Sequence, residues 1–514
     1  MRVVCAVAFA VVLHAQAGSY EEAVALVRAG EFAQAIPTIE KLVQANPNDL
    51  KARNLLGIAL SGAGRRTEAN QQFERVLQGN PRFLPALKNL AHNQLELGQV
   101  ELAERNFRSA LKAAPGDASV QFGLGRLGFL RKDYPSAVVH FEKSNGLHLQ
   151  DPLAIVEYAG SCIELGATDK ARVALASLPN AAPAGIQFQA GVLLARMSEY
   201  ASGAVRFELA RAAGFDGYKS GFNLGLALLK SGNAVAAIRV AEETLREAAA
   251  TSELYSLLAQ AYEKASRTKD AYEALRTAIR LNSTDESPYV ELIALCLDHE
   301  NQELGLEIAN LGVKAIPTSA RLRLQRGVIH ALASRSDDAL TDFRTAVRLR
   351  PDAPLGYVAE ALTLLRMDRN AEAAAMLRKR AKLKPDDHLA NWMLAEALVK
   401  IGPAAEREAI AALERSIETE PKMPQSRLLL GKLLLATGEV ERALVQLETA
   451  TQLDQANTGG AYLLAQAYRK AGRTEDANRL FARVSAAKAE DPSGASAKAL
   501  LRIVRDNMAT SSKQ

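Results

Sequence analysis

Small and bulky apolar residues recur along the chain with a period of 34 residues. The first column of small residues comprises Gly57, Ala91, Gly125, Ala159, Gly191, Gly225, Ala259, Gly327, Ala361, Ala395, Gly431 and Ala465. A second small column, from Ala35 to Ala477, lies twelve residues later, and a bulky column with Phe73, Phe107 and Phe141 follows four residues after that. Each period also holds two apolar runs with helical spacing, joined by a short turn that often contains Gly. The pattern predicts about fourteen helical hairpins.

Prolines mark the ends of the second helices, because proline has no amide hydrogen and stops a helix. They are Pro47, Pro81, Pro115, Pro317, Pro351, Pro385 and Pro421. We expect the small columns to let paired helices approach closely and the bulky column to fill the space to the next hairpin. Ile293 departs from the small column, and Leu149 stands where a proline is expected.

The period is interrupted twice. A step of 32 residues separates Ala159 from Gly191, near Pro179 and Pro183, and a step of 36 spans Gly402-Pro403. We expect the loss to shorten a second helix or its exit loop and the gain to lengthen a turn. A local change of superhelical twist is expected at both places.

These columns resemble the tetratricopeptide repeat family, over roughly residues 19 to 490. The resemblance implies an all-α fold: a right-handed α-α superhelix (a TPR solenoid) of about 14 helical hairpins plus a C-terminal capping helix. Residues 18–490 would form the array. Residues 491–508, with apolar Ala495, Ala499, Ile503 and Val504, would form the capping helix, and 509–514 a disordered tail. Trp392 lies one residue beyond the slot where the family often has an aromatic side chain.

The N-terminus has the features of a secretory signal peptide over residues 1–17. Arg2 precedes an apolar run from Val3 to Leu13, and Ala15-Gln16-Ala17 has the small-x-small form of a cleavage site. The run is too short to span a bilayer as a helix. We therefore expect an exported protein, periplasmic or extracellular in a bacterium; the alternative is that the segment is retained as an anchor.

Composition and charge argue against a nucleic-acid partner and against a disulfide. The 514 residues include 63 Lys and Arg and 58 Asp and Glu, a net charge of +5 that is too balanced to indicate a nucleic-acid partner. Cys162 and Cys296 lie four repeats apart, so we expect two buried small side chains rather than a disulfide.

Sequence motifs for catalysis or cofactor binding are missing or misplaced. Gly123, Gly125 and Gly128 spell a dinucleotide fingerprint, but that motif works only in a strand-to-helix turn, and here it falls in the middle of a predicted helix. No HExxH, CxxC, GxSxG or P-loop occurs. We predict no enzymatic activity, no catalytic residue, no cofactor and no metal site.

The family resemblance implies that the first helices line the concave face of the superhelix. Register places an apolar and aromatic column there, which predicts a groove for a partner peptide or protein; the alternative is that these side chains are merely buried between helices. A polar cluster at the front partly resembles the Lys and Asn clamp by which some relatives hold a peptide carboxylate. The predicted partner-binding residues are Lys51, Asn54, Lys88, Asn89, His92, Phe122, Arg126, Phe188, Phe222, Leu226 and Trp392.

Three hypotheses about function follow. The first is a non-enzymatic scaffold that binds a protein or peptide on this face. The second is an adaptor subunit of a cell-envelope assembly for polysaccharide export, secretion or pilus biogenesis. A glycan-binding solenoid is disfavoured because the chain has a single Trp. The basic segment 344–384, with Arg378, Arg380 and Lys384, is either a solvated face or a docking patch for an acidic protein or anionic lipid.

Overall fold

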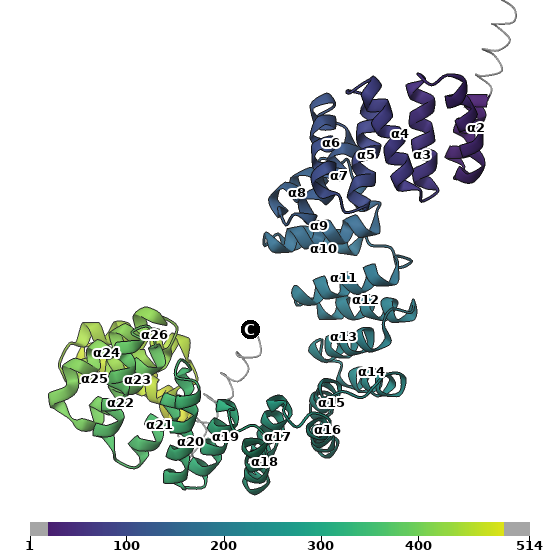
Figure 1. The fold of residues 1–514 in the computed structure, drawn as a ribbon. Helices are drawn as coiled ribbons and strands as arrows, with labels where there is room; N and C mark the ends of the chain where they lie inside the picture. The colour runs from purple at the N-terminus through teal and green to yellow at the C-terminus, as the bar shows by residue number, and fades with distance from the viewer. Residues whose placement is uncertain (1–18, 488–514) are drawn as a thin grey trace, which may run out of the picture. The chain divides into compact units, whose positions relative to one another are not determined.

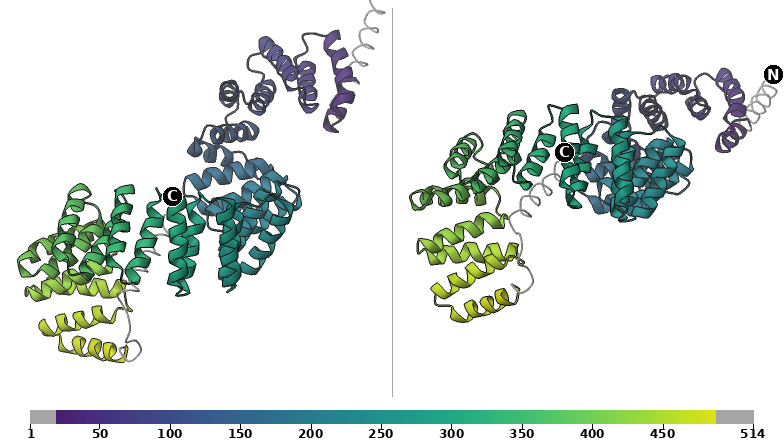
Figure 2. Two further views of the ribbon diagram at one scale, coloured as in Figure 1. Left: turned by 60° about the horizontal axis from the view of Figure 1, so that its bottom comes forward. Right: turned by 90° about the horizontal axis from the view of Figure 1, so that it is seen from below.

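The computed structural model describes residues 19–487, which are helical apart from turns and contain no strand (Figure 1). Contacts divide the chain into two compact units, 1–249 and 250–514. Each unit contains seven helical hairpins within its described residues, so the predicted number of about fourteen is confirmed for this part of the chain. In every view, the two helices of a hairpin run side by side (Figure 2).

The first unit begins with helical residues 19–28. Its other helices are α2 (Phe32–Ala45), α3 (Leu50–Gly62), α4 (Arg66–Gly79), α5 (Leu84–Glu96), α6 (Val100–Ala113), α7 (Ala118–Leu130), α8 (Tyr134–Glu142), α9 (Pro152–Glu164), α10 (Thr168–Ala176), α11 (Ala184–Arg196), α12 (Tyr200–Ala212), α13 (Gly217–Lys230) and α14 (Ala234–Glu247). A short 3-10 helix, η1 (Leu147–Leu149), lies between α8 and α9.

The second unit repeats the same architecture. Its helices are α15 (Ser252–Lys264), α16 (Thr268–Leu281), α17 (Glu286–Asp298), α18 (Gln302–Ala315), α19 (Ala320–Leu332), α20 (Ser336–Leu349), α21 (Pro354–Arg366), α22 (Asn370–Leu383), α23 (His388–Ile401), α24 (Glu406–Thr419), α25 (Pro424–Ala436), α26 (Val440–Leu453), α27 (Thr458–Lys470) and α28 (Thr474–Ala487). The 3-10 helix η2 (Pro403–Ala405) precedes α24.

The small and bulky columns meet inside each hairpin. A Cβ atom added at Gly125 on α7 would lie 2.6 Å from the Phe141 ring on α8. The bulky side chains also reach the next hairpin, as expected, because the Phe107 ring on α6 fills the space over Gly123 of α7. Phe107 and Phe141 are completely buried. The core is therefore a row of buried side chains, aromatic in some hairpins and Leu in others, that pack between neighbouring helices.

The departure at Ile293 is compensated within its own hairpin. Ile293 on α17 and Ala309 on α18 are both completely buried. Ala309 occupies the bulky column, sixteen residues after Ile293, as Phe141 does after Gly125. The large side chain has moved to the other helix, and the volume between the two helices is approximately conserved.

At both interruptions the lengths of the elements change as predicted, while the expected change of superhelical twist stays a prediction. The loss near Pro179 shortens a second helix, since α10 has nine residues whereas α12 has thirteen. The gain near Gly402 lengthens a turn, which holds η2.

One irregularity was not predicted. Helix α8 ends early, and η1 follows a left-handed Gly146 in the segment where Leu149 replaces a proline. The 3-10 helix brings the His148 ring into the core, 4.7 Å from the Tyr158 ring.

The remaining predictions concern the cysteines, membrane-spanning helices and the two ends of the chain. Cys162 and Cys296 are buried free thiols, as expected. No helix of residues 19–487 is long and apolar enough to cross a membrane. The signal peptide at 1–17, the capping helix at 491–508 and the tail at 509–514 lie outside the described residues and stay predictions.

Candidate partner-binding surface

The first helices of the hairpins lie closest together and form the inner side of each unit. In the first unit, α3 contacts α5, α5 contacts α7, α7 contacts α9 and α9 contacts α11. In the second unit, α17, α19, α21, α23, α25 and α27 form the same kind of chain of contacts. Successive second helices do not make comparable contacts. Along these two chains of contacts, the residues that register aims inward therefore lie on a shared surface, which we call the inner face. Helix α13 joins it by register alone, since Phe222 lies 34 residues after Phe188.

The polar cluster at the front of the first unit is held by internal contacts. Lys88 on α5 forms an ion pair with Asp117, with Nζ 2.8 Å from Oδ2, and Asp117 also caps the N-terminus of α7. Asn54 is buried, and its Oδ1 accepts no hydrogen bond within the described residues. Lys51 is exposed and Asn89 is half-buried. Of these four residues, only Lys51 presents an unpaired charge to solvent.

His92 is half-buried in this cluster. Its ring packs edge-to-face on Phe107, at 5.0 Å between centroids, and 6.3 Å from Phe122. Nε2 lies 3.2 Å from the Ser119 hydroxyl. Burial lowers the pKa of His92 to about 4, and the nearby Arg126 and Lys88 act in the same direction. The imidazole is therefore neutral at physiological pH and can offer only a neutral hydrogen bond.

Arg126 on α7 joins three successive first helices. Its Nη1 lies 2.6 Å from Glu96 Oε1 on α5, and its Nε lies 3.1 Å from Glu157 Oε2 on α9. A partner carboxylate at Arg126 or Lys88 would have to displace an existing ion pair. The arrangement therefore differs from an open anion clamp. The ion pairs of Arg126 connect three first helices, and so they make the inner face rigid.

An aromatic stripe continues the inner face of the first unit. Phe122, Phe188, Phe222 and Leu226 are half-buried, so each presents part of its side chain to solvent. Phe188 on α11 stacks on Phe215 at 4.5 Å between ring centroids.

The stripe also includes aromatic neighbours that the sequence reasoning missed. Besides Phe215, Tyr218 lies 6.1 Å from Phe222 in a stacked orientation. The spacing of four residues between Tyr218 and Phe222 within one helix could have indicated that pair.

The second unit corrects the interpretation of Trp392. This side chain is 9% exposed and belongs to the core around Met393 and Leu394, so it presents almost no surface to a partner. Val290, Leu324 and Val358, in the same column, are also buried. In the second unit these side chains are therefore buried between helices and do not line a groove, because adjacent first helices cover the column.

The three cations singled out in the basic segment 344–384 are all engaged within the protein. Arg378 forms a two-pronged ion pair with Glu408, with both distances 2.7 Å, and Lys384 Nζ lies 3.3 Å from Asp352. Arg380 is buried, and its guanidinium donates to Asp387 and to the carbonyl oxygens of Pro351 and Asp352. Arg380 is therefore a structural residue, and these three cations do not form an open docking patch.

The glycine-rich motif has a packing role. Gly123, Gly125 and Gly128 all lie within α7. A Cβ atom at Gly128 would lie 2.8 Å from the backbone nitrogen of Ala137 on α8. These glycines allow the helices to approach, and no strand precedes them within the described residues.

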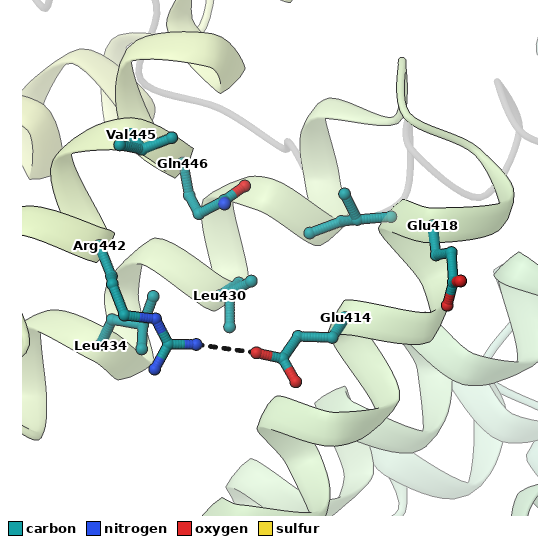
Figure 3. A pocket seen from close by; sticks show the side chains of 8 residues that line it. Glu414, Glu418, Leu430, Leu434, Arg442, Val445 and Gln446 are labelled. Atoms are coloured by element: carbon teal, nitrogen blue, oxygen red, sulfur yellow. Dashed lines mark hydrogen bonds and ion pairs between the residues drawn. The ribbon is translucent and has the colours of Figure 1, made fainter.

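Two outer hollows lie between successive second helices, in the same repeat register. One, of about 360 Å³, is bounded by α24, α25 and α26, with Leu430 and Leu434 in its lining (Figure 3). Arg442 donates to Glu414 across it, at 2.8 Å. The other, of about 400 Å³, is bounded by α6, α7 and α8. Within residues 19–487, no group of three or more His, Cys, Asp or Glu side chains is placed to hold a metal ion.

Comparison with protein families identifies repeats in several parts of the chain. Residues 12–82, 88–144 and 222–286 match a model described as tetratricopeptide repeat. Residues 404–484 match a model described as anaphase-promoting complex, cyclosome, subunit 3. No curated protein sequence matches the chain significantly.

Solved structures that resemble the chain are distant in sequence. Yeast Tom70 has 16% identity and a TM-score of 0.41, covering 84% of this chain and 96% of that one. A tetratricopeptide repeat protein from Parabacteroides merdae has 16% identity and a TM-score of 0.38, covering 49% and 98%. YrrB, described as a TPR protein with an unusual peptide-binding site, has 19% identity and a TM-score of 0.30, covering 38% and 99%.

Proposed function

We propose, from the premise that this chain carries tetratricopeptide repeats, that it is a non-enzymatic scaffold which binds a partner peptide or protein on its inner face. The observation that carries the proposal is the aromatic stripe of the first unit. Phe122, Phe188 and Phe222 are half-buried on a surface of packed helices, whereas the bulky-column phenylalanines of the same unit are almost completely buried. Aromatic side chains that stay partly exposed on a rigid surface are typical of protein interfaces.

Site-specific crosslinking tests this function. A photoreactive residue at Phe222 should capture a specific partner in the native cell, because Phe222 is partly exposed on α13. Val205 on α12 is the matched control, since it is 53% exposed but lies on a second helix. Capture of the same proteins from both positions, or of none from Phe222, would argue for a purely structural role.

A role in the cell envelope is a finer proposal. It is supported by the sequence of residues 1–17, which has the charged start, apolar run and small-residue site of a secretory signal. On this proposal the protein is exported in a bacterium and serves as an adaptor in an envelope assembly for polysaccharide export, secretion or pilus biogenesis. Cell fractionation with N-terminal sequencing of the mature protein tests it. A cytosolic protein that retains its first residues would exclude it.

A further inference from the structure

Unpaired positive charge gathers on the inner face of the last four hairpins. The inward positions of α21, α23, α25 and α27 are those equivalent to Phe122, to Arg126 and to the residue one helical turn after Arg126. Together they carry four cations and one carboxyl group. The cations are Arg366, Lys400, Lys432 and Lys470, and the carboxyl group is Glu396. The stripe therefore has a formal excess of positive charge.

These cations lack the carboxylate partners found in the first unit. Lys400 and Lys432 are exposed and form no ion pair within residues 19–487. Arg366 and Lys470 each donate to a backbone carbonyl of the preceding first helix, at 3.2 and 2.9 Å, and keep their charge uncompensated.

On α5 to α11 of the first unit, by contrast, the cations at the equivalent inward positions are paired, whereas Lys230 on α13 is exposed and forms no ion pair within residues 19–487. Lys88, Arg126 and Arg196 each lie within 3.1 Å of a carboxylate oxygen. The two inner faces thus differ in the charge that they present to a partner.

Glu396 can offset at most one of the four positive charges. Burial raises the pKa of its carboxyl group, even though Lys432 and Lys400 lie close enough to lower it. Neither lysine is within ion-pair distance, and Glu396 forms no hydrogen bond within the described residues. The half-buried carboxyl group of Glu396 can therefore accept a hydrogen bond from a backbone N–H of a bound peptide.

Apolar side chains lie beside these charges. Leu362 and Leu428 are half-buried, and Tyr462 is 43% exposed with its ring held edge-to-face on Phe481 at 5.6 Å. Leu428 reaches α27, where a Cβ at Gly460 would lie 3.4 Å from it. The surface therefore combines apolar contacts with unpaired ammonium groups.

We propose that this inner face of the second unit binds an extended acidic segment of a partner protein. Carboxylates of the segment pair with Lys400 and Lys432, and its apolar side chains pack on Leu428 and Tyr462. The inference rests on the proposed function, which it extends by naming the chemistry of the partner. Charge complementarity selects this partner, because basic or neutral segments would leave the lysines uncompensated.

The surface sets the length of the segment. Packed helices lie about 8–10 Å apart, so four first helices span about 30 Å. An extended chain covers that span with about ten residues. A probe of this length is therefore suitable.

Retention of designed peptides on the full-length protein tests the proposal. The probe is a library of C-terminally amidated peptides of about ten residues, drawn from Asp, Glu, Leu, Tyr and Ser. The comparison library replaces Asp and Glu by Asn and Gln. We expect the acidic library to be retained more strongly, with retention falling as salt rises. Equal retention of the two libraries would overturn the proposal.

Matched variants locate the site. An enriched acidic peptide should bind the Lys400→Gln/Lys432→Gln variant at least about tenfold more weakly, since two charge-assisted contacts are lost. The Lys382→Gln/Lys422→Gln variant removes the same charge from exposed lysines on α22 and in the loop before α25, and should bind normally. Equal weakening of both variants, or none in the first, would contradict the proposed site.

Crosslinking at Phe222 separates this inference from the general function. A partner captured there, together with failure of the acidic peptides, would reject only the acidic segment. Failure of both experiments would reject the scaffold function as well.

Discussion

At the scale of single residues, glycines are as important for the packing as the bulky residues that fill the space over them. Gly123, Gly125 and Gly128 create the space that the Phe107 and Phe141 rings and the α8 backbone occupy. The glycines cost helix propensity, about 1 kcal/mol each relative to Ala. Their presence in mid-helix is explained by the close approach of the neighbouring helix.

Replacement of Gly128 should therefore destabilise the protein. A Cβ at this position would meet backbone atoms of Ala137, which cannot rotate away. We expect Gly128→Ala to lower the free energy of unfolding by about 1–2 kcal/mol, because overpacking outweighs the gain in helix propensity. Gly217→Ala, in the first turn of α13 with no atom within 4 Å of the new Cβ, should leave stability unchanged or raise it. Urea unfolding of both variants provides the measurement.

His92 should make stability depend on pH. Its pKa is about 4 in the folded protein, below its usual value near 6.5. The unfolded chain therefore binds a proton first as the pH falls, and the folded state loses stability between pH 6.5 and 4. The expected slope is about 1.4 kcal/mol per pH unit. His92→Gln should reduce the slope between pH 6.5 and 5; an unchanged slope would show that the ring is not desolvated.

At the scale of the helices, each hairpin depends on a turn with a left-handed residue. Gly64, Gly98 and Gly166 adopt positive φ there, which glycine does without strain. Lys132 and Glu300 occupy the same place with φ of 59° and 58°. The turn geometry is therefore imposed by the packed helices even where the residue disfavours it.

Glycine should improve such a turn. Glu300→Gly should raise the free energy of unfolding by about 0.5–1 kcal/mol, since relief of the left-handed conformation exceeds the entropy cost of glycine. Gly64→Ala, with φ of +80°, should lower it by a similar amount. Thermal unfolding compares the two, and effects of the same sign would contradict the explanation.

The last hairpin shows what a neighbouring element contributes. Phe481 is half-buried, whereas Phe73, Phe107 and Phe343 in the same column are fully buried beneath the next hairpin. If residues 491–508 form the capping helix, truncation after Ala487 should expose this ring and lower the stability of α27 and α28. Hydrogen exchange in these helices measures the effect. No change in their protection would remove the capping role.

At the scale of the whole molecule, each hairpin of a unit contacts mainly its neighbours along the chain. Stability is then approximately a sum of hairpin terms and nearest-neighbour terms. Arg380 contributes to both kinds of term, because it joins α22 to Asp387 at the start of α23 and to carbonyl groups before α21. A substitution in one hairpin is therefore expected to lower the stability of that hairpin and its neighbours and to leave distant hairpins unchanged.

Removal of Arg380 tests this locality. Arg380→Ala leaves Asp387 buried without its ion-pair partner and should cost about 3–5 kcal/mol locally. Hydrogen exchange should accelerate in α21 to α24 and stay unchanged in α3 to α10. Arg378→Ala, which breaks a more exposed pair with Glu408, should cost less than about 1 kcal/mol. Acceleration in both units would show a longer-range cooperativity.

The pattern of small and bulky residues was sufficient to predict the hairpins, their approximate number and the irregular steps. This was possible because helix packing at close range demands small residues at one position and a bulky one sixteen residues later, and both demands appear in the local pattern. Ile293 is an exception in the small column, and its compensation by Ala309 is visible sixteen residues later in the sequence.

The set of inward side chains that a partner can reach depends on the packing of the folded chain and was not predictable from the pattern. Trp392 and Phe222 share one column, yet the first is buried and the second partly exposed. Arg126 is paired, whereas Lys432 is not. Whether a side chain is exposed, and whether its charge is compensated, depends on atoms about one repeat away along the chain. Those atoms belong to neighbouring helices, whose spacing and rotation vary from hairpin to hairpin. Residue register specifies the direction of a side chain, but not what lies in front of it.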